Sequence, residues 1–446
     1  MALNLILIIF FFYFAGYFFK KKLFLESIVF GTIVIYFLTV ISLFFINYYE
    51  LFLLLKVICL LSLSFFFLNN YHIIKLFNFD LKKINIKFIF FLILIFLIFY
   101  ENLKNIQSYT LEAGDSLAYW FNKTKFFVYN PGMEYIPKPS YPNFLSSLWA
   151  LSFFIFNFNY DLSRVVLPLL LILVFTLFFQ KINSTYSSNY FNKNIMLFFI
   201  FLIYFSTKKF ANIYRFSNAG YADFALSIYL MLGFLYIYIS FSENTFSKKD
   251  YLFGAVILGI SSSIKNEGLI VSLGLFSILN FIFIKYFFFN YKKNISYLFI
   301  VSLIFLVISF FPILLSMYLK SISITKDQST WEIFKFSNFF DYKIIISKIP
   351  IITKAFLLNM SQYYLIIFIM FIVFFFKYSL KFLQKPVFKL CIYLLIFFII
   401  YIYALYLATS YDLSWHLGSS IDRIIYHFCG IFVCMIFLIL NSDNKN

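Results

Sequence analysis

Charged residues are scarce in this chain. Of its 446 residues, 12% are charged and 63% are hydrophobic. This composition excludes a soluble domain, in which about a quarter of the residues are usually charged. Apolar runs of membrane-spanning length recur along the whole sequence, and short alternating strands are absent. The sequence therefore predicts an all-α polytopic membrane protein and not a closed β-barrel.

Cysteine and arginine are also rare. No cysteines form a CxxC pair, and all four lie in apolar segments: Cys59, Cys391, Cys429 and Cys434. They predict neither a disulfide framework nor a thiolate metal site. The excess of Phe, Ile, Lys and Asn is typical of an AT-rich genome. The phenylalanines therefore carry no functional signal beyond being apolar.

The net charge of +18 reflects an uneven distribution of lysine. Lys20, Lys21 and Lys22 close the first apolar run, and we take them as cytoplasmic. Alternating sides from there places most acids in the outer connections, while lysine dominates the cytoplasmic ones. The positive-inside rule therefore explains the charge better than nucleic-acid binding does.

Apolar runs bounded by charge or turn clusters give about 13 spans, with a range of about 11–14. These are 3–19, 28–47, 51–68, 88–100, 162–180, 195–206, 222–241, 252–264, 269–289, 295–318, 363–378, 390–407 and 424–440. The predicted units are N-terminal helices (1–100), a large first outer loop (101–160), central helices (161–318), a second outer loop (319–357) and C-terminal helices (358–446). The short apolar stretch 143–157 predicts an amphipathic, interfacial or re-entrant helix.

Polar clusters collect at the predicted outer ends of the spans. Asp115 begins an aromatic, amphipathic run in the first outer loop, and Asp223 begins a span. The segment 265–268 separates a short span from a long one, and its Gly268 is expected to permit a sharp turn. Ionisable groups near hydrocarbon are costly and usually face a cavity or a partner. Two further clusters complete the set: Asp412–Leu417, and Asp422-Arg423 directly before the last span.

Each cluster also has a purely structural interpretation. Asp115 and Asp223 suit the first turn of a helix. Lys265 and Glu267 suit an interfacial ion pair, and Asp422-Arg423 suits a topology anchor. Trp415 and Tyr119 suit an aromatic belt at the membrane interface. Lys56 suits a lysine whose charged end reaches the membrane surface, and His427 suits a structural role inside a span. Only the collection of these clusters on one face favours a functional site.

The clusters contain short motifs in a fixed order. They are Asp-Ser-Leu-Ala-Tyr-Trp (115–120), Tyr-Pro (141–142), Gly-Tyr-Ala-Asp (220–223), Lys-Asn-Glu-Gly (265–268), Asp-Leu-Ser-Trp-His-Leu (412–417) and Ser-Ile-Asp-Arg (420–423). Their order and sidedness resemble bacterial membrane glycosyltransferases of the GT-C class, relatives of the dolichyl-phosphate-mannose–protein mannosyltransferases. The resemblance spans most of the chain and implies a GT-C-like fold. It also implies an active site on the periplasmic face of the inner membrane of a bacterial cell envelope.

The resemblance further implies roles for residues. Asp115 would be the catalytic base that activates an acceptor hydroxyl. Lys265, Arg423 or His416 would stabilise the departing lipid phosphate. The substrate-binding residues that it implies are Tyr119, Trp120, Tyr141, Tyr221, Asp223, Lys265, Asn266, Glu267, Trp415, His416, Asp422 and Arg423.

The expected partners are a polyprenyl-phosphate sugar donor, a glycan, lipid or protein acceptor, and membrane lipids, with no nucleic acid. No metal site or cofactor is predicted. Gly114 stands where relatives often carry an aromatic residue, and no second acid stands beside Asp115. A divalent cation therefore stays an open question.

Two other functions stay open. A polysaccharide polymerase or ligase would share the lipid donor, but it is expected to place Arg and His in its large outer loops, and the largest loops here hold no Arg. A lipid-linked sugar flippase or ion-coupled transporter would place charges at the membrane midplane with internal repeats. Only Lys56 fits such a placement.

Overall fold

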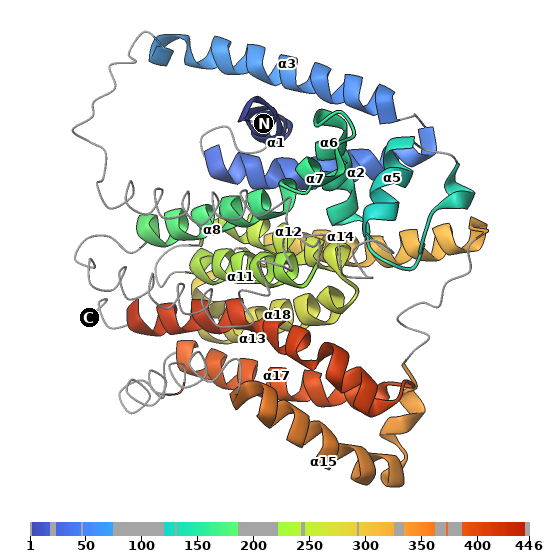
Figure 1. Ribbon diagram of the computed structural model, residues 1–446. Coiled ribbons are helices and arrows are strands. Elements are labelled where there is room, and N and C mark those ends of the chain that lie inside the picture. Colours follow the sequence, from blue (N-terminus) through green and yellow to red (C-terminus); the bar gives the residue numbers. More distant parts are fainter. Residues whose placement is uncertain are drawn as a thin grey trace.

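A computed structural model describes residues 2–17, 24–45, 48–74, 120–129, 132–185, 222–241, 246–291, 294–324, 334–361, 372 and 386–441. Every regular element in these ranges is a helix (Figure 1). Six of the described helices are long and apolar enough to cross a membrane, which indicates a membrane protein. Of the expected spans, 88–100 and 195–206 lie outside the described residues, as does nearly all of 363–378. The expected total of about 13 spans therefore stays a prediction.

The helices follow the predicted spans closely in most of the described ranges. They are α1 (Ala2–Tyr17), α2 (Phe24–Phe45), α3 (Tyr48–Ile74), α5 (Asn122–Tyr129), α6 (Phe144–Ile155), α7 (Tyr160–Ser163), α8 (Val166–Thr185), α11 (Ala222–Ser240), α12 (Lys248–Ile264), α13 (Glu267–Tyr291), α14 (Ile295–Ile322), α15 (Tyr342–Asn359), α17 (Pro386–Ala408) and α18 (Leu413–Asn441). Two 3₁₀-helices accompany them, η3 (Met133–Tyr135) and η6 (Phe336–Phe339).

Helix α11 forms the centre of the bundle, where α8, α12, α13 and α18 pack around it (Figure 1). Its sequence is apolar on all sides, as expected of a helix that is buried on all sides. In the most apolar 18-residue stretch of α11, 83% is buried inside the protein, whereas only 28% of the corresponding stretch of α14 is buried. Helix α14 exposes Phe299, Val307 and Leu314, and such an apolar outer face suits contact with lipid.

The last helix begins well before the expected boundary near residue 424. Helix α18 begins at Leu413, because the Asp412 carboxylate accepts a hydrogen bond from the backbone N–H of Trp415 at 2.8 Å and so caps the first turn. Trp415, His416, Asp422 and Arg423 therefore lie within one continuous helix. The expectation that Asp422-Arg423 precedes the last span is wrong.

The short helix α6 is buried within the bundle. All of its residues from Phe144 to Phe153 are buried, with α2, α5 and α8 packed against it. This burial fits a re-entrant helix better than an interfacial one. Lys56 has the opposite environment, because it is exposed on α3 at the edge of the bundle, with its Nζ 4.6 Å from the Phe52 ring centroid.

Candidate functional site

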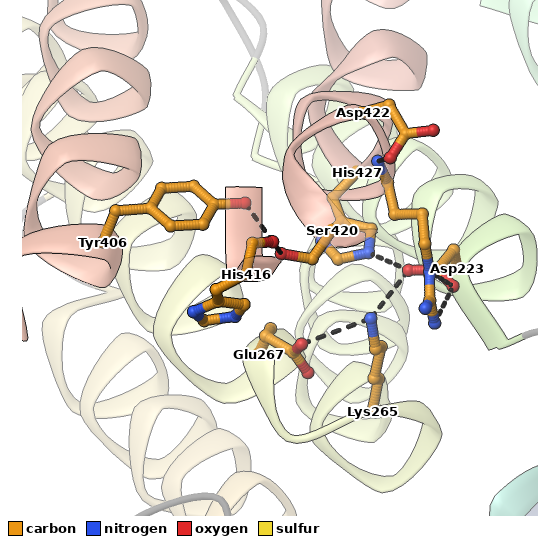
Figure 2. Close-up of polar contacts among 9 residues, drawn as sticks. Asp223, Lys265, Glu267, Tyr406, His416, Ser420, Asp422 and His427 are labelled. Atoms are coloured by element: carbon orange, nitrogen blue, oxygen red, sulfur yellow. Dashed lines mark hydrogen bonds and ion pairs between the residues drawn. The ribbon is translucent and has the colours of Figure 1, made fainter. Parts of the chain in front are cut away.

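Polar side chains from distant parts of the sequence meet at one end of α11. We call Asp223, Lys265, Glu267, Arg423 and His427 the Asp223 cluster (Figure 2). Asp223 lies in the first turn of α11, Lys265 ends α12 and Glu267 begins α13. Arg423 and His427 are four residues apart on α18, so they share one face of that helix. The cluster thus forms where α11, α12, α13 and α18 converge.

These contacts form because the helices that carry them approach one another closely. A Cβ atom on Gly268 would stand 2.2 Å from the Ser261 carbonyl oxygen, so only glycine lets α13 begin this close to α12. The chain does turn sharply between α12 and α13, at residues 265–266. Gly268 itself lies in α13 and is not among the positive-φ glycines of the described chain, so close packing and not backbone freedom is the reason for glycine. A Cβ on Gly430 would likewise stand 3.0 Å from the Ser227 carbonyl oxygen, between α18 and α11.

The Asp223 carboxylate is shared by three nitrogen-bearing side chains. Its Oδ1 accepts from Lys265 Nζ at 2.7 Å and from His427 Nε2 at 2.8 Å. Its Oδ2 lies 2.9 Å from both Nε and Nη2 of Arg423. The Asp223 side chain is only 5% exposed. Asp223 therefore holds cations from other helices in place, in addition to being the first-turn acid of α11 that the sequence suggested.

Lys265 links the two acids of the cluster. Its Nζ also lies 3.2 Å from Glu267 Oε1, which leaves one of its three ammonium hydrogens without a partner among the described residues. The Nδ1 atom of the fully buried His427 also has no hydrogen-bond partner in the described part of the chain. The cluster therefore keeps polar groups for which the described residues supply no partner.

The segment 140–143, which the sequence places in the predicted first outer loop, borders the cluster. Asn266 Nδ2 donates to the Ser140 carbonyl oxygen at 3.3 Å. The fully buried Lys123 donates to the Tyr141 carbonyl oxygen and to Asn143 Oδ1, the latter at 2.9 Å. These contacts hold the segment 140–143 between α5 and the α12–α13 junction.

Several predicted site residues lie elsewhere. Trp120 is 4% exposed and packs its ring edge-on against Tyr141, with centroids 6.5 Å apart, so it is buried instead of facing a ligand. Asp422 Oδ1 accepts from the backbone N–H of Arg423 at 2.9 Å, and Figure 2 shows its carboxylate pointing away from Asp223. His416 and Trp415 lie near the start of α18, and His416 Nδ1 pairs with Thr409 Oγ1 at 2.9 Å. Asp115, Tyr119 and Tyr221 fall outside the described residues.

His427 and Lys123 are the polar residues that sequence reasoning missed. His427 was expected to be structural because apolar residues surround it, yet it contacts Asp223 directly. The signal was its spacing of four residues from Arg423, which places both side chains on one helix face. Lys123 gave no such signal.

A second polar cluster lies at the opposite end of α11. We call Glu26, Lys181, Tyr236 and Asp250 the Glu26 cluster. Tyr236 donates to Glu26 Oε1 at 2.8 Å, and Lys181 Nζ pairs with Asp250 Oδ1 at 2.7 Å. Lys181 Nζ also lies 4.9 Å from the Tyr236 ring centroid. These contacts join α2, α8, α11 and α12.

The residues described do not fit a divalent cation. No group of three His, Cys, Asp or Glu side chains with the geometry to hold a metal ion occurs within the described ranges. The two carboxylates of the Asp223 cluster, Asp223 and Glu267, are both engaged by Lys265. A cation at this position would have to displace that ammonium group.

No family model matches this chain, and neither a curated protein nor a solved structure does.

Proposed function

We propose that this protein is a membrane glycosyltransferase that moves a sugar from a polyprenyl-phosphate donor to an acceptor hydroxyl. The observation that supports this proposal is the pairing of Lys265 and Arg423 on one buried carboxylate at one end of the bundle. Two fixed cations beside each other suit a phosphate group, because charge-assisted hydrogen bonds to phosphate are among the strongest in proteins. In this proposal the cluster faces the periplasm of a bacterial inner membrane.

The proposed reaction is a single displacement at the anomeric carbon. The acceptor oxygen forms the new bond to that carbon while the bond between the carbon and the phosphate oxygen breaks. The Asp115 carboxylate takes the proton of the acceptor hydroxyl. The lipid phosphate leaves with the bonding electron pair, and Lys265 and Arg423 stabilise the charge that develops on it.

The Asp223 side chain has a positioning role in this scheme. Its carboxylate oxygens already accept from Lys265, Arg423 and His427, so it is poorly placed to take a further proton. Because it fixes both cations before the donor binds, the phosphate site needs little rearrangement. Preorganised charge of this kind is usually the largest single contribution to catalysis.

The test is sugar transfer from a polyprenyl-phosphate donor extract in membranes that hold wild type or Asp115→Asn. We expect transfer to fall by at least about a hundredfold in the variant, a typical effect of losing a general base, at an unchanged protein level. Asp341→Asn is the matched control, because Asp341 only caps α15 and Asn caps helices equally well. Equal transfer by Asp115→Asn and wild type would exclude Asp115 as the base.

A lipid-linked sugar transporter is the second candidate. It is favoured by the contact between His427 and Asp223, because ionisable pairs inside membrane helices often belong to ion pathways. The exposed position of Lys56 on α3 weighs against it, since that lysine is then not part of an internal path. Movement of labelled lipid-linked sugar across vesicles without acceptor would favour transport, and its absence would favour transfer.

A further inference from the structure

The turn between α17 and α18 is held by the second outer loop. Lys348 Nζ donates to the carbonyl oxygens of Leu407 and Thr409, at 3.1 and 3.0 Å. The backbone N–H of Lys335 donates to the Ala408 carbonyl oxygen at 2.7 Å. Burial lowers the pKa of the Lys348 amine. Helix ends need partners for their last carbonyl groups, and here donors from a separate segment supply them, which fixes the turn.

This fixed turn orients His416. Thr409 is 1% exposed, and its Oγ1 pairs with His416 Nδ1 at 2.9 Å. The other ring nitrogen, Nε2, has no partner among the residues described. One nitrogen of a half-buried imidazole is therefore held by the protein while the other stays available for a ligand.

Aromatic rings surround this imidazole. The Tyr406 and Tyr411 ring centroids lie 5.1 and 5.7 Å from that of His416. Trp415 is 61% exposed and Tyr411 is 39% exposed. Their rings stand 5.4 Å apart at an angle of 74°, an edge-to-face contact that forms a partly exposed aromatic corner beside His416.

We infer that Tyr411, Trp415 and His416 form the acceptor subsite, and that it binds a carbohydrate ring. This inference rests on the proposed transferase function. An exposed indole face suits the C–H face of a sugar, while His416 Nε2 suits one of its hydroxyl groups. Tyr411 and Trp415 are uncharged, and Lys348, which holds the adjoining turn, binds carbonyl oxygens. The corner therefore suits a neutral, hydroxyl-rich ligand and not a phosphate.

The subsite adjoins the Asp223 cluster. Ser420 Oγ donates to the His416 carbonyl oxygen at 2.7 Å and pairs with the Tyr406 hydroxyl at 2.9 Å. Glu267 lies close enough to His416 to act on it electrostatically, and Figure 2 shows the two side chains on the same side of Lys265. A sugar at this corner would thus sit beside the proposed phosphate site. His416 belongs on the acceptor side, and Lys265 and Arg423 bind the donor.

A membrane-interface belt would explain the exposed Trp415 without any ligand. A belt residue needs an exposed ring at the right depth, but it does not require an oriented imidazole beside it. Tyr318, at the end of α14, supplies the matched comparison. It is 45% exposed, and no hydrogen bond of its side chain occurs within the described ranges.

The experiment is a fluorescence titration of the full-length purified protein with the methyl glycosides of glucose, galactose, mannose and N-acetylglucosamine. Glycerol serves as the polyol control. Trp415 is one of four tryptophans, so its signal is the difference between wild type and Trp415→Phe. We expect saturable quenching by at least one glycoside, with affinity lowered about tenfold in His416→Phe, as loss of one hydrogen bond implies. Tyr318→Ala should bind as wild type does.

Absence of saturable quenching by all four glycosides would overturn the inference, as would equal affinity in His416→Phe and wild type. The outcomes also separate this site from the proposed function. Glycoside binding without sugar transfer would keep a carbohydrate site and remove the transferase. Transfer without glycoside binding would keep the transferase and remove this subsite.

Discussion

The two ends of α11 carry polar clusters of similar composition and different geometry. In the Glu26 cluster the contacts are made in separate pairs, with Lys181 on Asp250 and the neutral Tyr236 hydroxyl on Glu26. In the Asp223 cluster one carboxylate serves Lys265, Arg423 and His427 together. The lysines are equally buried, since Lys181 and Lys265 are 15% and 14% exposed, but Asp223 is 5% exposed and Asp250 is 17% exposed.

The difference teaches how to tell a structural cluster from a binding site. The separate pairs of the Glu26 cluster join α2 to α11 and α8 to α12, which is a structural role. In the Asp223 cluster, Lys265 keeps one ammonium hydrogen for which the described residues supply no partner, and a ligand anion can use it.

The largest expected effect comes from removing the shared carboxylate. Asp223→Asn leaves Lys265 and Arg423 without their common partner, and breaking a buried charge network of this kind costs about 3–5 kcal/mol of unfolding free energy. Asp250→Asn removes only one partly exposed pair, which is worth about 1 kcal/mol. Thermal unfolding of both variants in detergent, followed by circular dichroism, compares them. Equal losses would show that the two clusters are energetically alike.

A smaller effect is expected at the helix junction. Gly268→Ala places a Cβ 2.2 Å from the Ser261 carbonyl oxygen, so α12 and α13 must separate at a cost of about 1–3 kcal/mol. Gly418→Ala is the matched control on α18, where an added Cβ meets nothing within 4 Å. Better helix propensity should leave that control unchanged or more stable. The measurement is the denaturation midpoint of each variant and of wild type. A Gly268→Ala protein as stable as wild type would contradict the close contact between α12 and α13.

The smallest expected effect concerns the hydrogen bond between His427 and Asp223. His427→Gln keeps an N–H donor for Asp223, so the loss of stability should stay below about 1 kcal/mol. His427→Phe fills the space without a donor and should cost about 1–3 kcal/mol, because Asp223 Oδ1 loses one of its two donors and keeps only Lys265. If both variants unfold at the same temperature, the contact between His427 and Asp223 contributes little.

Much of the Asp223 cluster was predictable from sequence. Asp223 and the segment 265–267 were expected at the same side of the membrane, because each lies at the end of an apolar run. Arg423 was expected there too, although as part of a loop. A shared membrane level made their meeting possible, but it did not select them, because Trp415, His416 and Asp422 were expected at the same level and make other contacts.

The rest depended on packing that a single sequence does not reveal. Polar residues from 413 to 423 resemble a loop, but the Asp412 cap makes them helical and so aligns Arg423 with His427. Trp120 looked like a sugar-stacking residue, yet it packs inside the bundle. The burial of Lys123 likewise follows from tertiary contacts with Tyr141 and Asn143.

The most direct test compares one lysine from each cluster. Lys265→Met and Lys181→Met both replace a partly buried ammonium group with a neutral side chain of similar length. Sugar transfer from polyprenyl-phosphate donor is measured per folded molecule, with the thermal midpoint recorded on the same sample. We predict that Lys265→Met lowers transfer by on the order of a hundredfold, whereas Lys181→Met lowers the midpoint and leaves transfer per folded molecule unchanged. Unchanged transfer by Lys265→Met would contradict the assignment of the Asp223 cluster as the donor phosphate site.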